Sequence, residues 1–478
     1  MTESKASRPD SAGAAARLVT RNFLTLGAGE MLARLIGFGA TVFIARQLGA
    51  DAYGIVGFGF AVSLYLATAA DAGLEQHGPQ EVASGAVPLD RLISSVLIGR
   101  FTLALVLAIG LGAASFLAPR TDAIVLALYG LTLLPAGANA RWAHYGLRNG
   151  GTVARARVAA ELLRVILVLA LVREPADALF VPLAQFAGDS LAAFWMIRRL
   201  RANDVHLSFT FDRAVFLAVL RRAGPLLANN LLALAIYNAD VIFLRFFRTV
   251  VEVGQYLAAY TLINFLGVLG NLATVTLLPN LAHLRESLIE RAGLVHTALA
   301  RVFVAGLPIA VGGSLLARRL IDFVFGAEYA PAGPVLALLI WTIPPLLSRG
   351  VYSAVLIADN RHDAVLRATA IAAALNVGLN LLMIPMLGMI GAAITTVLAE
   401  AIRVLLTRAW AQRSGLARIP LERLARVALA TAVMAVAIVA TPALPLPLAL
   451  LGGILVYFAT LSAAGGLGWE GGRPVLRV

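Results

Sequence analysis

Three polar residues interrupt a long apolar stretch near the start of the chain. Asn22, Glu30 and Arg34 lie within residues 22–47 at steps of eight and four. A helix places these residues on one stripe, with Glu30 and Arg34 one turn apart. Because a charge in apolar surroundings is costly, the stripe must face a cavity, a partner or an interface. A mutually neutralised structural pair and a pair that binds a ligand both satisfy this requirement.

Similar polar stripes occur in three further apolar stretches, residues 53–77, 214–246 and 254–283. Within them we select Asp71, Asn229, Asp240, Asn264 and Asn271. We predict that the four stripes line one hydrophilic cavity, in which Glu30, Asp71 and Asp240 exchange a proton or a cation. For any single Asn the alternative is a hydrogen bond between two helices.

Three further arginines lie in apolar surroundings. Arg164 follows Glu161, and Arg403 follows Glu400, each by three residues. These spacings favour neutralised structural pairs. Arg349 lies about ten residues from the helix end at Asp359, too deep for its side chain to reach the interface fully, so we predict that it also faces the cavity.

Composition identifies the chain as a membrane protein. Of its 478 residues, 60% are hydrophobic and 14% are charged, and the mean hydropathy is +0.85. Soluble domains have about 45–50% apolar and about 25% charged residues, so the composition excludes that class. A spanning helix takes about 20 residues, and the apolar residues suffice for about 14 such helices. They leave no room for a soluble catalytic domain.

Apolar stretches separated by Pro and Gly predict an all-α polytopic membrane protein with about fourteen spanning helices. The stretches are residues 22–47, 53–77, 91–118, 122–145, 155–172, 178–197, 214–246, 254–283, 296–320, 332–358, 364–387, 389–411, 424–441 and 446–466. We expect a cytoplasmic tail, two lobes of six helices around a central cavity, and two extra helices with a short tail. These four segments are residues 1–21, 22–200, 201–413 and 414–478.

An internal repeat relates the two lobes. An offset of 200 residues aligns eight identities between residues 21–54 and 221–254, among them Gly54 with Gly254. Internally duplicated transporters bind their substrate between the halves. The repeat therefore favours a transporter with a central site.

Several kinds of chemistry are excluded or unsupported. The chain has no Cys, and none of its six His residues has metal-ligand spacing, so we expect no disulfide and no metal site. Lys5 does not follow a glycine-rich phosphate loop. The net charge is +13, but the basic residues are scattered between apolar stretches and form no nucleic-acid-binding face. We expect no cofactor, no nucleic-acid partner and no enzyme activity.

The distribution of basic residues sets the topology. With the N-terminus inside, 29 of the 39 Lys and Arg residues fall on the cytoplasmic side, seven on the opposite side and three within spans. Cytoplasmic loops of membrane proteins carry this excess of positive charge. We predict a multi-pass protein of the cytoplasmic (inner) membrane with both termini in the cytoplasm.

Three motifs point to one family by their order and spacing. The first runs from Ala45-Arg46-Gln47-Leu48-Gly49 to Tyr53-Gly54. The second is Ala70-Asp71-Ala72-Gly73-Leu74-Glu75, followed by Gln80-Glu81-Val82-Ala83. The third runs from Phe325-Gly326-Ala327-Glu328-Tyr329 through Asn376, Asn380, Ile384-Pro385 and Gly388 to Glu400. Over residues 20–413 the chain resembles the bacterial polysaccharide flippases, which share a superfamily with multidrug antiporters and lipid II flippases.

The resemblance implies a two-lobed bundle whose central cavity opens alternately to either side. The substrate it implies is an oligosaccharide on undecaprenyl pyrophosphate, used for surface polysaccharide or lipopolysaccharide such as O-antigen. Arg34 would contact the pyrophosphate, because guanidinium donates paired hydrogen bonds to phosphate oxygens. We expect the protein to be a monomer that contacts membrane lipid and has a polysaccharide polymerase and glycosyltransferases as partners.

Two other functions compete with this interpretation. A multidrug antiporter of the same superfamily would have the same fold but would favour acidic residues for cationic drugs, whereas residues 22–47 carry both Glu30 and Arg34. A polytopic glycosyltransferase or ligase needs acid and base groups on sizeable extracytoplasmic loops. Here those loops are short.

Reporter fusions test the predicted topology. Fusions after Asp204 and Gly415 are expected to be cytoplasmic, and fusions after Asp122 and Leu444 periplasmic, because the basic residues retain their loops inside. Paired alkaline phosphatase and fluorescent-protein fusions measure the side. A periplasmic signal after Asp204 would contradict the helix count.

Overall fold

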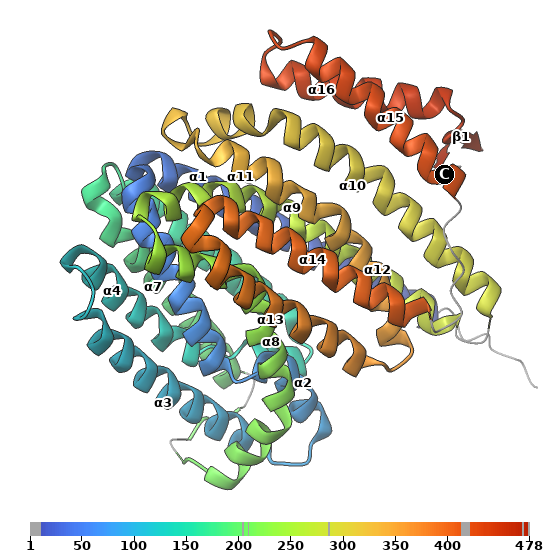
Figure 1. Ribbon diagram of the computed structural model, residues 1–478. Coiled ribbons are helices and arrows are strands. Elements are labelled where there is room, and N and C mark those ends of the chain that lie inside the picture. Colours follow the sequence, from blue (N-terminus) through green and yellow to red (C-terminus); the bar gives the residue numbers. More distant parts are fainter. Residues whose placement is uncertain are drawn as a thin grey trace, which may run out of the picture. The chain divides into compact units, whose positions relative to one another are not determined.

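The computed structural model describes residues 11–202, 205–208, 210–284, 287–412, 421–470 and 473–476. Helices make up nearly all of this part of the chain (Figure 1). The α-helices are α1 (Ser11–Asp71), α2 (Leu74–Ser84), α3 (Leu89–Ser115), α4 (Arg120–Gly137), α5 (Arg141–Gly146), α6 (Gly150–Leu171), α7 (Phe180–Arg201), α8 (Arg213–Phe247), α9 (Val250–His283), α10 (Leu288–Val324), α11 (Ala332–Leu339), α12 (Ile343–Ala358), α13 (His362–Leu387), α14 (Met389–Gln412), α15 (Leu421–Ala440) and α16 (Leu446–Ala463). Short 3-10 turns are η1 (Pro175–Leu179), η2 (Ala327–Tyr329) and η3 (Ile340–Thr342).

The predicted all-α class is confirmed. Within the described residues, ten helices are long and apolar enough to cross a membrane, and the total of fourteen stays a prediction. The exception to the helical class is a hairpin in which β1 (Leu467–Glu470) pairs antiparallel with β2 (Arg473–Leu476). The helices establish a multi-pass membrane protein.

Several predicted helix boundaries differ from the structure, among them residues 122–145, which divide between α4 and α5. Two of the differences have clear reasons. The sequence predicts separate helices over residues 22–47 and 53–77, but α1 runs from the first stretch into the second with a break at Gly49 (φ 70°, ψ 174°) and ends at Asp71, before α2 begins at Leu74. Such a positive φ suits glycine, which lacks a Cβ. Residues 332–358 form α11, η3 and α12 instead of one helix, because Pro344 and Pro345 at the start of α12 lack the amide hydrogens that would continue α11.

The chain folds into two compact units. Unit 1 comprises the residues up to Thr41 together with Leu66–Val172 and Leu179–Leu226, and unit 2 comprises Val42–Tyr65, Arg173–Ala178 and the residues from Leu227 onward. The middle of α1 therefore belongs to the unit that contains the second half of the sequence. The lobe boundaries predicted above stay a proposal.

In unit 1, pairs of neighbouring helices pack around a buried core. Helix α3 packs on α4, α6 on α7, and α2 on α5. The core includes Trp142, Ile93 and Leu200, each at most 1% exposed. Trp142 lies so close to Gly78 that a Cβ there would come within 2.6 Å of the ring, which fixes the approach of α5 to α2.

The start of α8 is anchored within unit 1 by Asp212. Its carboxylate accepts hydrogen bonds from the backbone N–H groups of Ala214 (2.9 Å) and Val215 (3.1 Å), which caps the helix. These bonds and the Arg91 guanidinium hold the pKa of Asp212 below its usual range, and the Val215 N–H contributes most. The chain segment between α7 and α8 is thereby fixed to α3.

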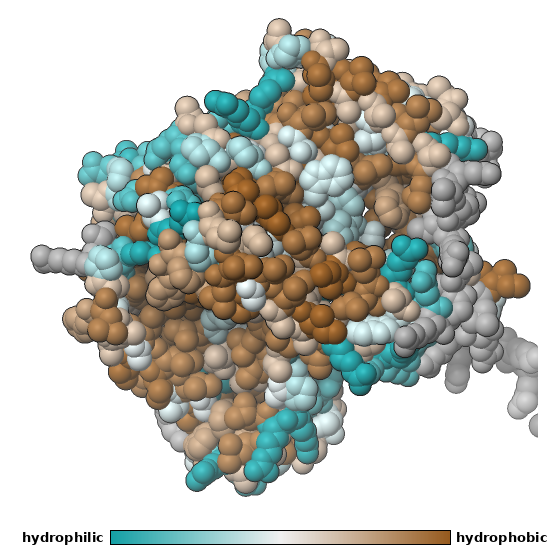
Figure 2. All heavy atoms as spheres, viewed as in Figure 1, coloured by the Kyte–Doolittle hydropathy of each residue, from teal (hydrophilic) through white to brown (hydrophobic). Residues whose placement is uncertain are grey.

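In unit 2, α13 packs on α14, α9 on α12, and α15 on both α16 and α10. Met434, Tyr457 and Leu461 form part of the core around the last two helices. Other large apolar side chains point outward, such as Leu455 of α16, which is 70% exposed. Hydrophobic residues cover much of the surface in Figure 2. Lipid is the solvent in which such an exterior is stable.

Candidate functional site

Unit 2 contains a buried cluster of two arginines, one glutamate and one tyrosine. Glu400 of α14 accepts hydrogen bonds from Arg349 of α12 (Nε to Oε2, 3.3 Å) and from Arg403 one turn away (Nη1 to Oε1, 3.3 Å). The hydroxyl of Tyr237 on α8 donates to Glu400 Oε1 (2.5 Å). Thr369 of α13 accepts from Arg403 Nη2 at 3.0 Å. Four helices therefore meet at this cluster.

The cluster carries one excess positive charge, because two guanidinium groups share one carboxylate. The side chain of Glu400 is fully buried, that of Arg403 is 9% exposed, and that of Arg349 is 17% exposed. Arg349 has five N–H donors, of which Nε and one on Nη2 make hydrogen bonds within the described residues. The most accessible cation of the cluster thus has donors left for an anion.

The structure brings together residues that the sequence analysis assigns to separate roles. The spacing of Glu400 and Arg403 predicts a structural pair, and the two residues do form an ion pair. Arg349 has no acid at helical spacing, and its acid proves to be Glu400, 51 residues away. Sequence reasoning misses Tyr237 and Thr369. Tyr237 precedes Asp240 by one helical turn, a spacing that could have drawn attention to it.

Asp240 is a fully buried carboxylate on α8. It accepts hydrogen bonds from the hydroxyl of Tyr256 on α9, from Thr396 of α14 (3.4 Å) and from the backbone N–H of Val241 (2.9 Å). No Arg, Lys or His forms an ion pair with it among the described residues. The same residues contain no group of three or more metal-ligating side chains. Neutral donors therefore surround this acid.

Asp71 has a different environment in unit 1. It forms an ion pair with Arg100 of α3 at 3.0 Å, and the Arg100 side chain is 5% exposed. Arg100 also donates to the carbonyl of Asn139 at 2.8 Å. One turn beyond Asp71, Glu75 pairs with Arg141. These contacts make Asp71 part of the packing between helices.

The remaining candidates are spread over the chain. Glu161 and Arg164 form the expected pair on α6, close to Gly37 of α1. Asn229 is half-buried and Asn264 is exposed. The side chains of Asn22, Glu30, Arg34 and Asn271 lie outside the described residues.

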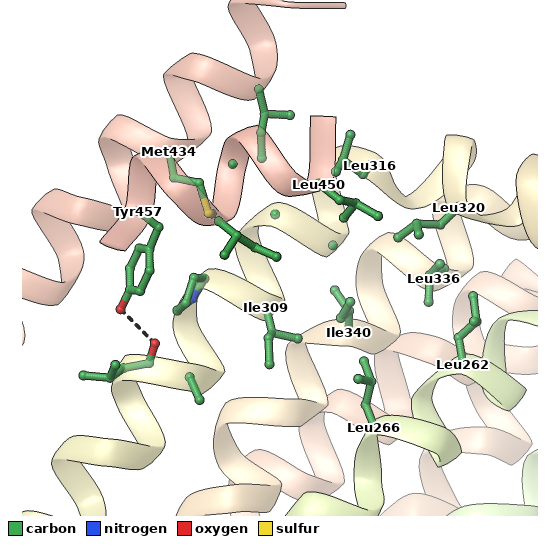
Figure 3. A pocket seen from close by; sticks show the side chains of 18 of the residues that line it. Leu262, Leu266, Ile309, Leu316, Leu320, Leu336, Ile340, Met434, Leu450 and Tyr457 are labelled. Atoms are coloured by element: carbon green, nitrogen blue, oxygen red, sulfur yellow. Dashed lines mark hydrogen bonds between the residues drawn. The ribbon is translucent and has the colours of Figure 1, made fainter. Parts of the chain in front are cut away.

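Unit 2 also contains an open apolar cavity of about 500 Å³ between α9, α10, α11, α15 and α16. Leu266, Ile309, Ile340 and Leu450 point into it (Figure 3). Tyr457, which contributes an aromatic ring to the wall, turns its hydroxyl to the carbonyl of Val304 (2.8 Å). The cavity therefore has hydrocarbon walls.

The solved structures most informative for the fold are transporters. A lipid II flippase MurJ in an inward closed conformation matches with a TM-score of 0.79 and 15% identity, over 93% of this chain and 98% of that chain. An inward-facing multidrug resistance MATE family transporter of the MOP superfamily matches with a TM-score of 0.61 and 15% identity, over 80% and 95% of the two chains. A MOP superfamily transporter from Pyrococcus furiosus matches with a TM-score of 0.54 and 16% identity, over 82% and 94%.

These likenesses and the buried polar groups define the class: a multi-pass membrane protein with the fold of MOP superfamily transporters. A model of the polysaccharide biosynthesis protein family matches residues 19–285, more than half of the chain. The chain belongs to this family, which confirms the resemblance drawn from its motifs. No curated protein sequence matches the chain significantly.

The charge balance of the cluster predicts unequal effects on stability. Glu400→Ala leaves two buried guanidinium groups without a counter-charge and is expected to cost about 3–5 kcal/mol. Arg349→Gln leaves the pair of Glu400 and Arg403 neutral and is expected to cost less. Thermal unfolding in detergent micelles measures both variants.

The control for this experiment is the exposed pair of Asp363 and Arg367 (3.4 Å), whose side chains are 63% and 72% exposed. Asp363→Ala is expected to cost less than about 1 kcal/mol, because water screens such a pair. A Glu400→Ala protein as stable as the Asp363→Ala protein would contradict the proposed charge balance.

Proposed function

We propose that this protein is a flippase that translocates a polyprenyl-pyrophosphate-linked oligosaccharide across the cytoplasmic membrane by alternating access. The glycan would serve surface polysaccharide or lipopolysaccharide biosynthesis. Membership of the polysaccharide biosynthesis family supports a role with saccharides. The likeness to a lipid II flippase supports a lipid-linked substrate.

The single observation that carries the proposal is the excess guanidinium of Arg349 and Arg403 over Glu400. A pyrophosphate is an anion whose oxygens accept paired hydrogen bonds from guanidinium. In apolar surroundings the excess cation is stabilised when such an anion arrives. Glu400 and Tyr237 hold Arg349 in position while the anion is absent.

The apolar cavity of unit 2 suits the lipid part of this substrate. Its walls offer hydrocarbon to a polyprenyl chain, and burying such a chain is favourable by about 0.8 kcal/mol per CH₂. A polar headgroup site and an apolar cavity thus occur in the same unit.

The residues selected from the sequence complete the proposed substrate path. Arg34 would bind the pyrophosphate, with Glu30 as its ion-pair partner. The amide side chains selected from the sequence would bind the sugar, and these are Asn22, Asn229, Asn264 and Asn271. We further propose an inner-membrane location, cytoplasmic termini, a monomer, and a polysaccharide polymerase and glycosyltransferases as partners.

Among the acids proposed for coupling, Asp240 is the best supported. An ionised carboxylate in apolar surroundings needs a counter-ion, and a proton or a cation would supply it. Asp71 already has Arg100 as its counter-ion. The membrane potential is the alternative driving force, worth about 2.3 kcal/mol per charge per 100 mV.

A multidrug antiporter is the second candidate function, because one matching structure is a multidrug resistance transporter. A cationic drug would be repelled by the net positive cluster around Arg349. Efflux of a cationic dye such as ethidium from cells that produce the protein distinguishes the two functions.

A flipping assay tests the proposed contacts. In proteoliposomes, dithionite quenching of a fluorescent undecaprenyl-pyrophosphate-linked sugar measures transport. Arg349→Ala and Arg34→Ala are each expected to lower the rate about tenfold or more, because each removes a charge-assisted hydrogen bond of about 1.5–3 kcal/mol. Substitution by Lys keeps the charge but loses the paired donors, so its effect is expected to be intermediate.

The control for Arg34 is the double variant Glu30→Gln/Arg34→Gln. A purely structural pair predicts that the double variant regains full activity, which would contradict a substrate contact. Wild-type flipping by Arg349→Ala would likewise contradict the role of the cluster.

Coupling is tested by the response to a gradient. Asp240→Asn is expected to abolish acceleration by an imposed proton or sodium gradient while flipping down a substrate gradient continues, because the amide cannot take up a proton or neutralise a cation. Asp71→Asn is expected instead to lower stability, since it leaves Arg100 buried and unpaired. Unchanged gradient dependence in Asp240→Asn would exclude Asp240 as the coupling residue.

A further inference from the structure

The break in α1 at Gly49 is held by a segment that lies far away in the sequence. Glu328 of η2 accepts a hydrogen bond from the backbone N–H of Ala50 (2.6 Å), directly after the break. This N–H begins the second stretch of α1, where helix geometry leaves amides without intrahelical acceptors. The carboxylate thus caps a helix that starts in mid-chain.

The same contact also caps the C-terminal end of α10, where a side chain donates hydrogen bonds instead of accepting one. Arg46, on the first stretch of α1, donates from Nε to the carbonyl of Val324 (2.7 Å) and from Nη2 to that of Phe323. These carbonyls end α10, where no intrahelical donor remains. Each segment therefore supplies the polar group that the other one needs.

Small residues bring the backbones of α1 and α9 together beside this contact. A Cβ added to Gly54 would come within 2.2 Å of the carbonyl of Val250, and one added to Gly254 within 2.0 Å of the carbonyl of Ala50. Gly54 and Gly254 are also equivalent positions of the 200-residue repeat. The crossing is thus a meeting of equivalent segments from the two halves of the sequence.

The contact has the features of an interface that can separate. The side chains of Arg46 and Glu328 belong to exposed residues, so water can replace their hydrogen bonds when the segments part. At Gly54 and Gly254 the two backbones approach each other directly, because neither residue has a Cβ. Tyr329, whose hydroxyl donates to the carbonyl of Ala45 (2.7 Å), fixes the register when the segments meet.

We propose that Arg46 and Glu328 form a reversible latch that closes the extracytoplasmic side of the transport path. This proposal rests on the alternating access and the topology proposed above, in which the break at Gly49 and the end of α10 lie outside the cytoplasm. Release of both caps would free the crossing of α1 with α9 and open the path outward. Re-formation would return the protein to a state closed on that side.

Cysteine labelling tests the latch without any substrate. The chain has no Cys, so Ala50→Cys provides a single thiol at a position that is fully buried beside Glu328. A membrane-impermeant maleimide added outside cells measures how often this position opens. Glu328→Ala and Arg46→Ala are each expected to raise the labelling rate about fivefold, because each removes hydrogen bonds from the closed state alone.

Two control variants sharpen the result. Glu328→Gln keeps an oxygen acceptor for the backbone N–H at position 50. Its labelling rate is therefore expected to lie near that of the Ala50→Cys protein in which Glu328 and Arg46 are unchanged. Asp322→Asn changes a nearby exposed acid whose side chain makes no hydrogen bond within the described residues, and no change is expected. Should Ala50→Cys fail to fold, Thr261→Cys replaces it, because Thr261 lies at the hydroxyl of Tyr53 (3.3 Å) at the same crossing.

The outcomes separate the latch from the proposed function. Unchanged labelling in both Glu328→Ala and Arg46→Ala would overturn the latch and identify the contact as a permanent clamp. Labelling that rises only when the reagent enters the cytoplasm would overturn it too, because the contact would then lie on the wrong side. Faster labelling from outside supports the latch even if the lipid-linked sugar is not flipped, a result that would reject the proposed substrate alone.

Discussion

The free-energy cost of placing charge in apolar surroundings determines how the buried charged side chains of this protein are arranged. Arg100 is stabilised by Asp71, and Arg403 by Glu400 and Thr369. Two of the buried charges described above lack a counter-charge of their own. One is the guanidinium of Arg349, which shares Glu400 with Arg403, and the other is the carboxylate of Asp240, which is surrounded by neutral donors. In a membrane protein such charges are expensive. Both lie in unit 2 and contact residues of α14.

The first family motif and the start of the third contact each other through backbone and helix-capping groups. Gly49 supplies a backbone conformation that side chains disfavour, and Arg46 and Glu328 cap the helix ends that this conformation creates. The two motifs lie 278 residues apart in sequence and complete each other in space. Their order and spacing therefore reflect a contact between two remote segments of the chain.

Sequence order and spatial grouping differ in one important place. The segment Val42–Tyr65 comes from the first half of the chain but packs within unit 2. Its glycines permit the close approach of α9, since a Cβ at Gly54 would collide with backbone.

The order of residues along the chain is sufficient to predict the class of the protein. Hydropathy locates the helices, because a helix in lipid must satisfy its own backbone hydrogen bonds and expose apolar side chains. Motif order identifies the family, and i,i+3 spacing finds the pairs of Glu161 with Arg164 and of Glu400 with Arg403. Folding adds the partners that spacing cannot supply: Glu400 for Arg349, Glu328 for Ala50, and different surroundings for Asp71 and Asp240. Helical periodicity fixes the face on which a side chain lies, whereas the neighbour on that face is decided by how remote helices pack.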